Sequence, residues 1–490
     1  MKNAGAPQET ASRPPIVVVL GHVDHGKTTL LDSIRKTNVA TGEAGGITQK
    51  IGAYQIEISN PKSKTPNKIT FIDTPGHEAF SKMRVRGANV ADIAVLVVGA
   101  NDGVKPQTEE SIQHILAAKI PYVVAINKID LPEADPKKVK QQLAKKDVLV
   151  EELGGQVVAH LLSAKTGKGV PELLDVILLL SEMNGIKGRS SGPAAGVIIE
   201  ATQDKHRGNI ATVIVREGIL NIGDTIFAEN VKCKVKAMFD DRGQSVTQAN
   251  PGTPVLVMGW ERLPEIGSVV TEIESSKNAQ SETSIPTVFA LPPLDETRKL
   301  KVILKTDATG SLEAIVASFP KAVDVVAQGV GEITESDVML AKSTGAFVIG
   351  FNVKPMGRVA KLATLEGVRI KNYSLIYELL EQISEVVELL NQPVQEDILG
   401  EAEIIAQFAA QGEPVAGCVI KEGRIVRNDL VRIMRQQKEM GKGRVKSIRH
   451  LKDDISKAEK GTECGVIFDK KLDFRPGDRI IAYKIRDLLT

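Results

Sequence analysis

A glycine-containing segment near the N-terminus has the residue types and spacing of a phosphate-binding loop. Gly21-His-Val-Asp-His-Gly-Lys-Thr28 fits the pattern GxxxxGK[ST]. Glycines let successive backbone N–H groups face phosphate oxygens, and a helix start adds the positive end of its dipole. We expect Lys27 to reach the β and γ phosphates. The full set of predicted phosphate-binding residues is Gly21, His22, Val23, Asp24, His25, Gly26, Lys27, Thr28 and Thr29.

Two hydroxyls and one carboxylate are the predicted ligands of Mg²⁺. Asp73 opens the sequence Asp73-Thr-Pro-Gly76, where the carboxylate can hold the ion through a water and the Gly76 N–H can sense the γ phosphate. The Thr28 hydroxyl is the second ligand. Thr48 lies in a loop and can complete the shell only when the γ phosphate is present, which makes a two-state switch. A solvent-exposed loop threonine is the alternative.

Two further short motifs predict a guanine-binding site. In Asn127-Lys128-Ile-Asp130, the Asp130 carboxylate can accept hydrogen bonds from the guanine N1–H and exocyclic amine, which adenine cannot supply in that arrangement. A buried carboxylate left unpaired rejects the wrong base strongly. The segment Ser163-Ala164-Lys165 can close over the base with its backbone amides. The predicted nucleotide is therefore GTP.

His77, directly after the Asp73–Gly76 motif, is the predicted catalytic residue. It stands where many small GTPases carry the glutamine that orients the attacking water. A merely structural histidine is the alternative. We expect His22 and His25 to be structural and Asp24 to help bind a cation.

Strands alternating with helices must position these motifs. Apolar β-branched runs separated by helical patterns predict a mostly parallel sheet with crossover helices, in a P-loop GTPase domain over 15–185. The expected strands are 16–20, 68–72, 93–99 and 122–127, and the expected helices include 28–35 and 171–181.

After Pro193 the pattern changes to short strands and turns, which predicts a β-barrel over 186–284. A small α/β domain follows over 285–370, with Ser311 as the N-cap of a helix. Helical spacing of apolar residues over 371–392 predicts a connector helix, or alternatively a core helix of the preceding domain. A second β-barrel is expected over 393–490, because the interval from Gly218 to Asp224 recurs from Gly423 to Asp429. Residues 1–14 are predicted to be a disordered tail.

Composition restricts the class of protein. Sixty-three Lys and Arg balance sixty-one Asp and Glu, and 42% of the 490 residues are hydrophobic, which is typical of globular domains. No apolar run reaches the ~18 residues of a membrane helix. Three widely spaced cysteines predict neither a disulfide framework nor structural zinc, so we expect a cytoplasmic protein. Eleven Lys and Arg against three acids over 421–452 indicate a local basic surface, either solvated or facing phosphates.

These motifs together resemble the translational GTPases, and further segments resemble bacterial-type translation initiation factor 2. The resemblance runs from about Pro15 to the end of the chain, and the family's domain order matches the one predicted above. The segments that carry it, besides those at 21–28, 73–77 and 127–130, are Gly45–Tyr54, His77–Phe80, Gly331–Asp337, Gly350–Val353 and Thr462–Gly465.

The resemblance implies a translation initiation GTPase that is stimulated by the ribosome. It implies that the chain binds formyl-methionyl initiator tRNA, places it on the small ribosomal subunit, promotes joining of the large subunit and works with other initiation factors. It also implies a monomer off the ribosome, with no membrane partner. The residues that match the family's tRNA pocket in the last barrel are Cys418, Arg435, Glu463, Cys464 and Gly465. The residues alone favour small buried core side chains as the explanation of the cysteines, and it is the resemblance that favours the pocket.

The sequence departs from the family pattern at three places. In this sequence about fourteen residues precede the expected GTPase domain, where family members usually carry a long charged extension. The stretch from Ser311 to Ala327 is short, and Leu451 replaces a common aromatic of the pocket. Two other functions stay open. One is an elongation-type or specialised aminoacyl-tRNA carrier, in which the barrels normally follow one another directly. The other is a GTP-gated scaffold with negligible hydrolysis, against which Lys27, Asp73 and His77 argue.

Overall fold

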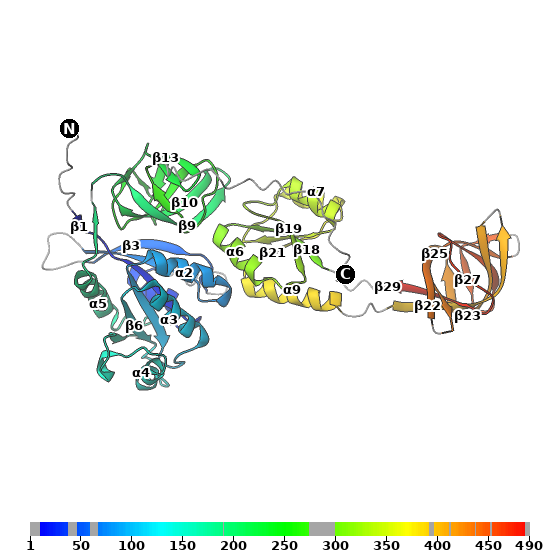
Figure 1. The fold of residues 1–490 in the computed structure, drawn as a ribbon, viewed down its shortest axis with the longest axis horizontal. Helices are drawn as coiled ribbons and strands as arrows, with labels where there is room; N and C mark the ends of the chain where they lie inside the picture. Colours follow the sequence, from blue (N-terminus) through cyan, green and yellow to red (C-terminus); the bar gives the residue numbers. More distant parts are fainter. Residues whose placement is uncertain are drawn as a thin grey trace. The chain divides into compact units, whose positions relative to one another are not determined.

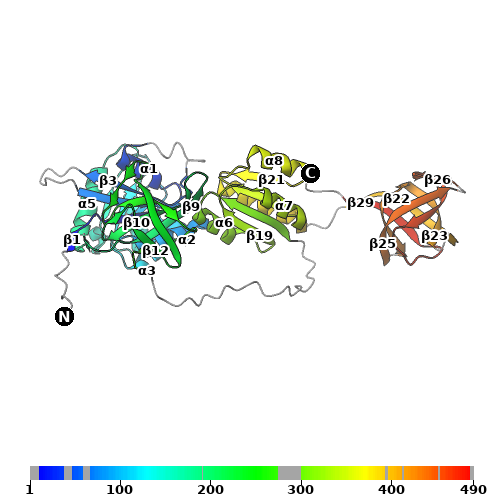
Figure 2. The same ribbon diagram turned by 90° about the horizontal axis from the view of Figure 1, so that it is seen from above.

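The computed structural model divides the chain into two compact units, Met1–Ser384 and Glu385–Thr490. Figures 1 and 2 show the elements of each unit. The predicted fold class is confirmed, since a P-loop-type α/β domain, a barrel and a small α/β domain lie in the first unit and a barrel lies in the second. The structure describes residues 10–37, 47–58, 67–189, 191–273, 299–391, 396–410, 413–436, 438–450 and 453–485.

The first domain is built on a sheet in the order β3-β4-β2-β5-β6-β7. Its central strands are continuous apolar runs buried on both faces, as parallel strands covered by helices must be. Only β3, at the edge, is antiparallel to its neighbour. The strands are β2 (Ile16–Gly21), β3 (Gly52–Ile58), β4 (Asn67–Asp73), β5 (Ile93–Gly99), β6 (Tyr122–Asn127) and β7 (Ala159–Leu161); the helices are α1 (Lys27–Arg35), α2 (Ser81–Val90), α3 (Pro106–Ala118), α4 (Pro136–Ala144) and α5 (Val170–Met183).

The prediction of a disordered tail is wrong for residues 10–14. Strand β1 (Thr10–Ser12) pairs antiparallel with β8 (Lys187–Arg189). The Arg13 guanidinium then donates two 2.7 Å hydrogen bonds to the carboxylate of Asp92. This buried bidentate pair is what attaches the segment to the domain. Residues 1–9 lie outside the described residues.

A barrel follows in the order β12-β17-β9-β10-β16-β13-β14, and pairing of β12 with β13 closes the ring. Its interior holds alternate apolar side chains, including the single tryptophan, Trp260. The strands are β9 (Ala195–Asp204), β10 (Gly208–Glu217), β11 (Leu220–Asn221), β12 (Thr225–Ala228), β13 (Val231–Phe239), β14 (Ser245–Val246), β15 (Gln248–Ala249), β16 (Pro254–Trp260) and β17 (Val269–Thr271).

The small α/β domain has a parallel sheet in the order β19-β18-β20-β21. Ser311 was expected as a helix N-cap, but it is buried inside α6 and the cap position is Ala308. The helix begins earlier because Gly310 packs against the neighbouring barrel strand through Glu200. The elements are β18 (Leu300–Thr306), α6 (Thr309–Ser318), β19 (Val323–Val330), α7 (Glu335–Thr344), β20 (Phe347–Phe351), α8 (Gly357–Leu365) and β21 (Ile370–Tyr373).

Helix α9 (Ile376–Asn391) follows β21 after two residues. The predicted helical segment 371–392 is therefore too long at its start, because residues 370–373 pair with β20. The apolar stripe predicted at helical spacing is buried at Ile376, Leu379 and Ile383. The helix is thus packed along this face, and its role as a connector stays a prediction.

The second unit is a barrel in the order β22-β29-β24-β25-β28-β23-β27, closed by pairing of β22 with β23. The ring of long twisted strands is visible in Figure 2. The strands are β22 (Glu396–Ala410), β23 (Glu413–Val426), β24 (Leu430–Arg435), β25 (Lys438–His450), β26 (Asp453–Ile455), β27 (Lys457–Glu459), β28 (Glu463–Phe468) and β29 (Arg479–Ile485).

The sequence repeat between the barrels has a common geometry. Gly218 and Gly423 both have positive φ, at 69° and 64°. The carboxylates of Asp224 and Asp429 each accept a 2.7 Å hydrogen bond from the backbone N–H three residues earlier. The same turn therefore recurs in both barrels. Among the described residues, no helix is both long enough and apolar enough to span a membrane.

Candidate functional site

The phosphate-binding motif lies between β2 and α1 in a conformation that requires its glycines. Gly21 and Gly26 have φ of 143° and 85°, and Gly26 is the N-cap of α1. A Cβ on Gly21 would lie 2.3 Å from the Val97 carbonyl oxygen, and one on Gly26 would lie 2.5 Å from the Asn127 amide nitrogen. Side chains are thus excluded at both positions, and the loop backbone stays close to β5 and β6.

The Lys27 amine is buried within this loop. Its Nζ donates to the carbonyl oxygens of Gly21 at 2.9 Å and His22 at 2.8 Å. Burial lowers the pKa of Lys27 to about 8, because the charged form loses its hydration. A phosphate placed beside Nζ would raise this pKa again and provide stronger, charge-assisted acceptors.

Three oxygen-bearing side chains from separate elements meet beside the loop. Thr48 Oγ1 lies 2.8 Å from Thr28 Oγ1 and 3.4 Å from Asp73 Oδ2. Two hydroxyls and a carboxylate are donors that suit Mg²⁺, which prefers oxygen ligands and keeps several waters. The residues predicted as metal ligands are therefore brought together, and their chemistry fits the ion. A cavity of about 220 Å³ opens here, lined by Val23, Asp24, Gly26, Lys27, Thr28, Thr29, Ile47, Thr48, Gly76, His77 and Lys128.

The predicted base-binding residues form one hydrogen-bonded group. Asn127 donates to the His25 carbonyl oxygen at 2.9 Å and accepts from the Ala164 N–H at 2.9 Å, so it joins the phosphate loop to the segment 163–165. Ser163 Oγ donates to Asp130 Oδ1 at 2.6 Å. This hydrogen bond lowers the pKa of the Asp130 carboxyl, which therefore stays an acceptor at neutral pH. Lys165 is exposed beside them.

Two residues of the phosphate-binding motif, His25 and Asp24, differ in their surroundings. His25 is fully buried and its Nδ1 lies 3.4 Å from the Val97 carbonyl oxygen, and burial lowers its pKa to about 4. It is therefore a neutral packing residue, as expected. Asp24 takes positive φ (64°) at the mouth of the cavity. Its predicted role in cation binding stays a prediction.

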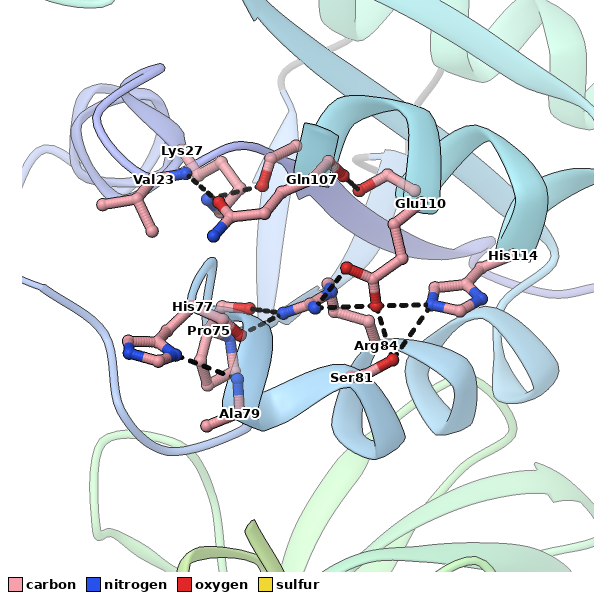
Figure 3. Close-up of polar contacts among 12 residues, drawn as sticks. Val23, Lys27, Pro75, His77, Ala79, Ser81, Arg84, Gln107, Glu110 and His114 are labelled. Carbon is pink, nitrogen blue, oxygen red and sulfur yellow. Dashed lines mark hydrogen bonds and ion pairs between the residues drawn. The ribbon is translucent and has the colours of Figure 1, made fainter. Parts of the chain in front are cut away.

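A buried arginine that sequence reasoning missed supports the Asp73–His77 loop. Figure 3 shows the Arg84 guanidinium between the carbonyl groups of Pro75 and His77 on one side and Glu110 on the other. It donates to those carbonyls at 3.1 and 2.5 Å and to both Glu110 oxygens at 2.8 Å. Arg84 is completely buried, so it acts as an internal brace that determines where the loop backbone lies. The only sequence signal for it was a helical arginine, which has no special spacing.

His77 lies at the edge of the cavity and is held by two contacts. Its Nδ1 accepts a 2.9 Å hydrogen bond from the Ala79 N–H, and its ring packs 4.2 Å from the ring of Tyr377, centroid to centroid. Burial lowers the pKa of His77, so the imidazole is neutral near pH 7. Because Nδ1 is the acceptor, the proton of the neutral ring is on Nε2.

The loop that contains Thr48, the predicted switch residue, is also hydrogen-bonded to the start of α9. The Gln49 side chain, adjacent to Thr48, donates to the Ser374 carbonyl oxygen at 2.8 Å and accepts from the Ile376 N–H at 3.0 Å. Gln49 is 6% exposed, so these bonds are shielded from water. No residue pattern in the sequence indicated this contact, because its partners are more than 300 positions away.

The second unit holds a cavity of about 590 Å³ at the residues predicted to bind tRNA. Cys418, Glu463, Cys464 and Gly465 line it, and their role in tRNA binding stays a prediction. Residues that sequence reasoning missed complete the lining: Ile405, Ala406, Phe408, Val415, Gly417, Arg449 and His450. Ile405 and Phe408 are more than half exposed, so the wall is largely apolar. Leu451 lies outside the described residues.

Arg435 does not line this cavity, in contrast to the prediction. Its Nε and Nη2 donate to the two oxygens of Asp478 at 3.0 and 2.9 Å. Pairing with Asp478 raises the pKa of Arg435 further. A bidentate pair uses two N–H groups on one edge of the guanidinium, so the cation supports the start of β29 instead. Part of the positive charge of the segment 421–452 is likewise neutralised by a partner outside it, since Lys421 pairs with Glu403 at 2.9 Å.

Comparison with known families and proteins supports a specific assignment. The family described as Elongation factor Tu GTP binding domain matches residues 12–182, Elongation factor G domain 2 matches 193–273, and Translation-initiation factor 2 matches 274–384. The translation initiation factor IF-2 of Moorella thermoacetica is 43% identical over 98% of this chain and 56% of its own length. The chain thus spans little more than half of that relative.

Other relatives are covered more fully. The translation initiation factor IF-2 of Thermoanaerobacter sp. (strain X514) is 43% identical over 97% of this chain and 72% of its own. Among solved structures, GDP-bound aIF5B from Aeropyrum pernix aligns over 96% of this chain and 92% of its own, with 28% identity and a TM-score of 0.44. On the extent and identity of the sequence matches, the chain belongs to the translation initiation factor IF-2 family.

Proposed function

We propose that this protein is a translation initiation GTPase. It binds GTP with Mg²⁺ in the first domain and formyl-methionyl initiator tRNA in the C-terminal barrel. It places that tRNA on the small ribosomal subunit, promotes joining of the large subunit and hydrolyses GTP on the assembled ribosome. The observation that carries the proposal is the convergence of Lys27, the Thr28–Thr48–Asp73 oxygens and Asp130 on one edge of a parallel sheet.

Each part of the nucleotide has a partner in this arrangement. The β and γ phosphates lie on the loop N–H groups and Lys27, and guanine pairs with Asp130. Thr28, Thr48 and Asp73 would hold a Mg²⁺ ion, which would supply positive charge beside the transferring phosphoryl group. Thr48 reaches this site from a loop that Gln49 ties to α9. Loss of the γ phosphate therefore loosens both the Thr48 loop and that attachment.

His77 acts on the attacking water. With Nδ1 occupied by the Ala79 N–H, the neutral ring offers its Nε2–H as a donor, which orients a water oxygen rather than removing its proton. The Tyr377 ring restrains the imidazole in this structure. Slow intrinsic hydrolysis and strong ribosomal stimulation follow, because phosphoryl transfer depends mainly on positioning.

The C-terminal cavity suits the aminoacyl end of an initiator tRNA. Its walls of Phe408, Val415 and Cys418 can hold an unbranched thioether side chain. Arg449 lies at the cavity, where its Nε donates to Asp454 Oδ1 at 2.7 Å, and its remaining N–H groups can face the terminal phosphates. We assign this role to Arg449 in place of Arg435, which does not line the cavity and is bound through two N–H groups to both oxygens of Asp478.

The test is GTP turnover by the wild type and His77→Ala, with and without both ribosomal subunits and initiator tRNA. Removing one positioned group costs about 10²–10⁴-fold in rate, so subunit-dependent stimulation should fall by that factor in His77→Ala. GTP binding should stay intact, because the phosphate loop is unchanged. The exposed His206, on a turn of the first barrel, provides the matched control His206→Ala, which should behave as the wild type.

Two results would contradict the proposal. A wild type that binds GTP but shows no ribosome-dependent turnover would favour the GTP-gated scaffold. Equal delivery of elongator and initiator tRNAs would favour the elongation-type carrier.

A further inference from the structure

Two cysteines lie directly opposite each other in the C-terminal barrel. Cys418 of β23 and Cys464 of β28 are register partners in an antiparallel ladder. Their sulfur atoms are 3.8 Å apart, and both side chains are buried thiols, exposed by 2% and 6%. Directly opposed residues in antiparallel strands have Cα atoms about 4.5–5.5 Å apart, within the range of about 4.4–6.8 Å that a disulfide bridges.

The two thiols differ in chemistry and border the same cavity. Cys418 Sγ donates toward Cys464, which lowers the pKa of the Cys464 thiol and raises that of Cys418. Cys464 is therefore the better nucleophile, since the thiolate is the reactive form. Both cysteines line the 590 Å³ cavity, which gives a small oxidant a route to them without unfolding the barrel.

A metal site is a poorer explanation for the pair. The described part of the chain contains no group of three or more His, Cys, Asp or Glu side chains placed to hold an ion. The nearest histidine, His450, lies 2.6 Å through Nδ1 from the Glu463 carbonyl oxygen, so that ring nitrogen is a donor. Two thiols alone leave a disulfide as the natural product.

We propose that Cys418 and Cys464 form a reversible disulfide on exposure to a peroxide, and that this bond weakens ligand binding in the C-terminal cavity. The Cys464 thiolate attacks hydrogen peroxide, giving a sulfenic acid and hydroxide. The Cys418 sulfur then displaces the hydroxyl from the Cys464 sulfenic acid, forming the S–S bond, and water leaves with the Cys418 proton. Overall, two thiols are oxidised and one peroxide is reduced to two waters.

The functional consequence rests on the proposed tRNA binding at this cavity. Bond formation brings the sulfurs from 3.8 Å to about 2.05 Å, which draws both side chains away from their present contacts. It also cross-links β23 to β28, so this wall can no longer adjust to a ligand. In a reducing compartment such bonds are transient and report oxidation. Initiation would thereby stop under oxidative stress and resume on reduction.

The chain has an internal control in Cys233. This thiol is also buried, in the first barrel, but its described hydrogen bond is a long one, 3.9 Å to the Met258 carbonyl oxygen. Burial raises the pKa of Cys233 to about 12. It should therefore stay reduced under conditions that oxidise the pair.

The experiment treats the full chain with hydrogen peroxide, alkylates the remaining thiols in denaturant and maps peptides by mass spectrometry. We expect a Cys418–Cys464 cross-linked peptide, alkylated Cys233 and reversal by dithiothreitol. Cys233→Ser should still form the cross-link, and Cys418→Ser should not. Three alkylated thiols in the wild type, or a cross-link that includes Cys233, would overturn the proposal.

Binding of formyl-methionyl tRNA is then measured for the reduced and the oxidised chain. The oxidised form should bind about 10–200-fold more weakly, the range for altering one apolar wall group, and reduction should restore binding. Equal affinity of the two forms would overturn the claim that the disulfide weakens ligand binding in the cavity. If the reduced chain does not bind the tRNA, the proposed function fails, whereas the peptide map still decides disulfide formation independently.

Discussion

A buried glutamate between the barrel and the small α/β domain should make the stability of the first unit depend on pH. Glu200, on β9, is 7% exposed, and its Oε1 accepts from the Ala201 N–H at 2.9 Å and the Gly310 N–H at 3.3 Å. Its Oε2 accepts no hydrogen bond from the described residues. Burial raises the pKa of Glu200 from 4.5 to about 7, because the carboxylate loses its hydration.

The sign and size of the effect follow from linkage. Below pH 4.5 the carboxyl is protonated in both the folded and the unfolded chain, and burial carries no electrostatic cost. As the pH rises toward 7, the unfolded chain ionises first, so the free energy of unfolding falls by about 1.4 kcal/mol per pH unit. Above pH 7 the loss levels off at about 3 kcal/mol. Glu200→Gln keeps the Oε1 acceptor, removes this titration and leaves an amide N–H₂ that costs about 1–3 kcal/mol independently of pH.

The assay is urea unfolding followed by the fluorescence of Trp260, the single tryptophan, which lies in the same barrel. Between pH 5 and pH 8 the stability of Glu200→Gln should rise relative to the wild type by about 2.5 kcal/mol. The exposed Glu229 provides the control Glu229→Gln, which should show the pH dependence of the wild type. A difference between Glu200→Gln and wild type that is the same at both pH values would refute the reasoning.

Three further predictions concern contacts around the nucleotide site. Asp130→Asn should weaken GTP binding by about 10²–10⁴-fold and favour XTP, because two charge-assisted hydrogen bonds of about 1.5–3 kcal/mol each are lost and an amide matches xanthine; competition binding of GTP against XTP measures this. Arg84→Met should destabilise the first domain by about 3 kcal/mol, because Glu110 loses its guanidinium partner and keeps only Ser81 and His114 of its described partners. The double variant that adds Glu110→Leu should recover part of this loss in urea unfolding, and no destabilisation of the single variant would contradict the brace. Gln49→Ala should accelerate hydrogen exchange of the Ile376 amide by about 5–100-fold, since one of its two bonds protects that N–H; unchanged exchange by mass spectrometry would contradict the tie to α9.

The chain by itself determined the nucleotide site to a large extent. Gly21, Gly26 and Lys27 act through the backbone of one short loop, and Asp73 and Asp130 follow apolar runs that can only be buried strands. These features depend on sequence separations of a few residues, where steric limits and strand or helix periodicity decide the structure. The order of strands, helices and barrels was predictable for the same reason.

Tertiary structure decided the contacts that couple these elements. Gln49 bonds to Ile376 at the start of α9, 327 residues away in sequence, and Cys418 faces Cys464 only because of the register of β23 against β28. The positive charge of Arg435 suits either a phosphate or a carboxylate partner. In the folded chain its partner is the carboxylate of Asp478. Arg84 likewise has no sequence signature. A side chain's partner is set by which distant segment packs against it, and local propensity contains no information about that choice.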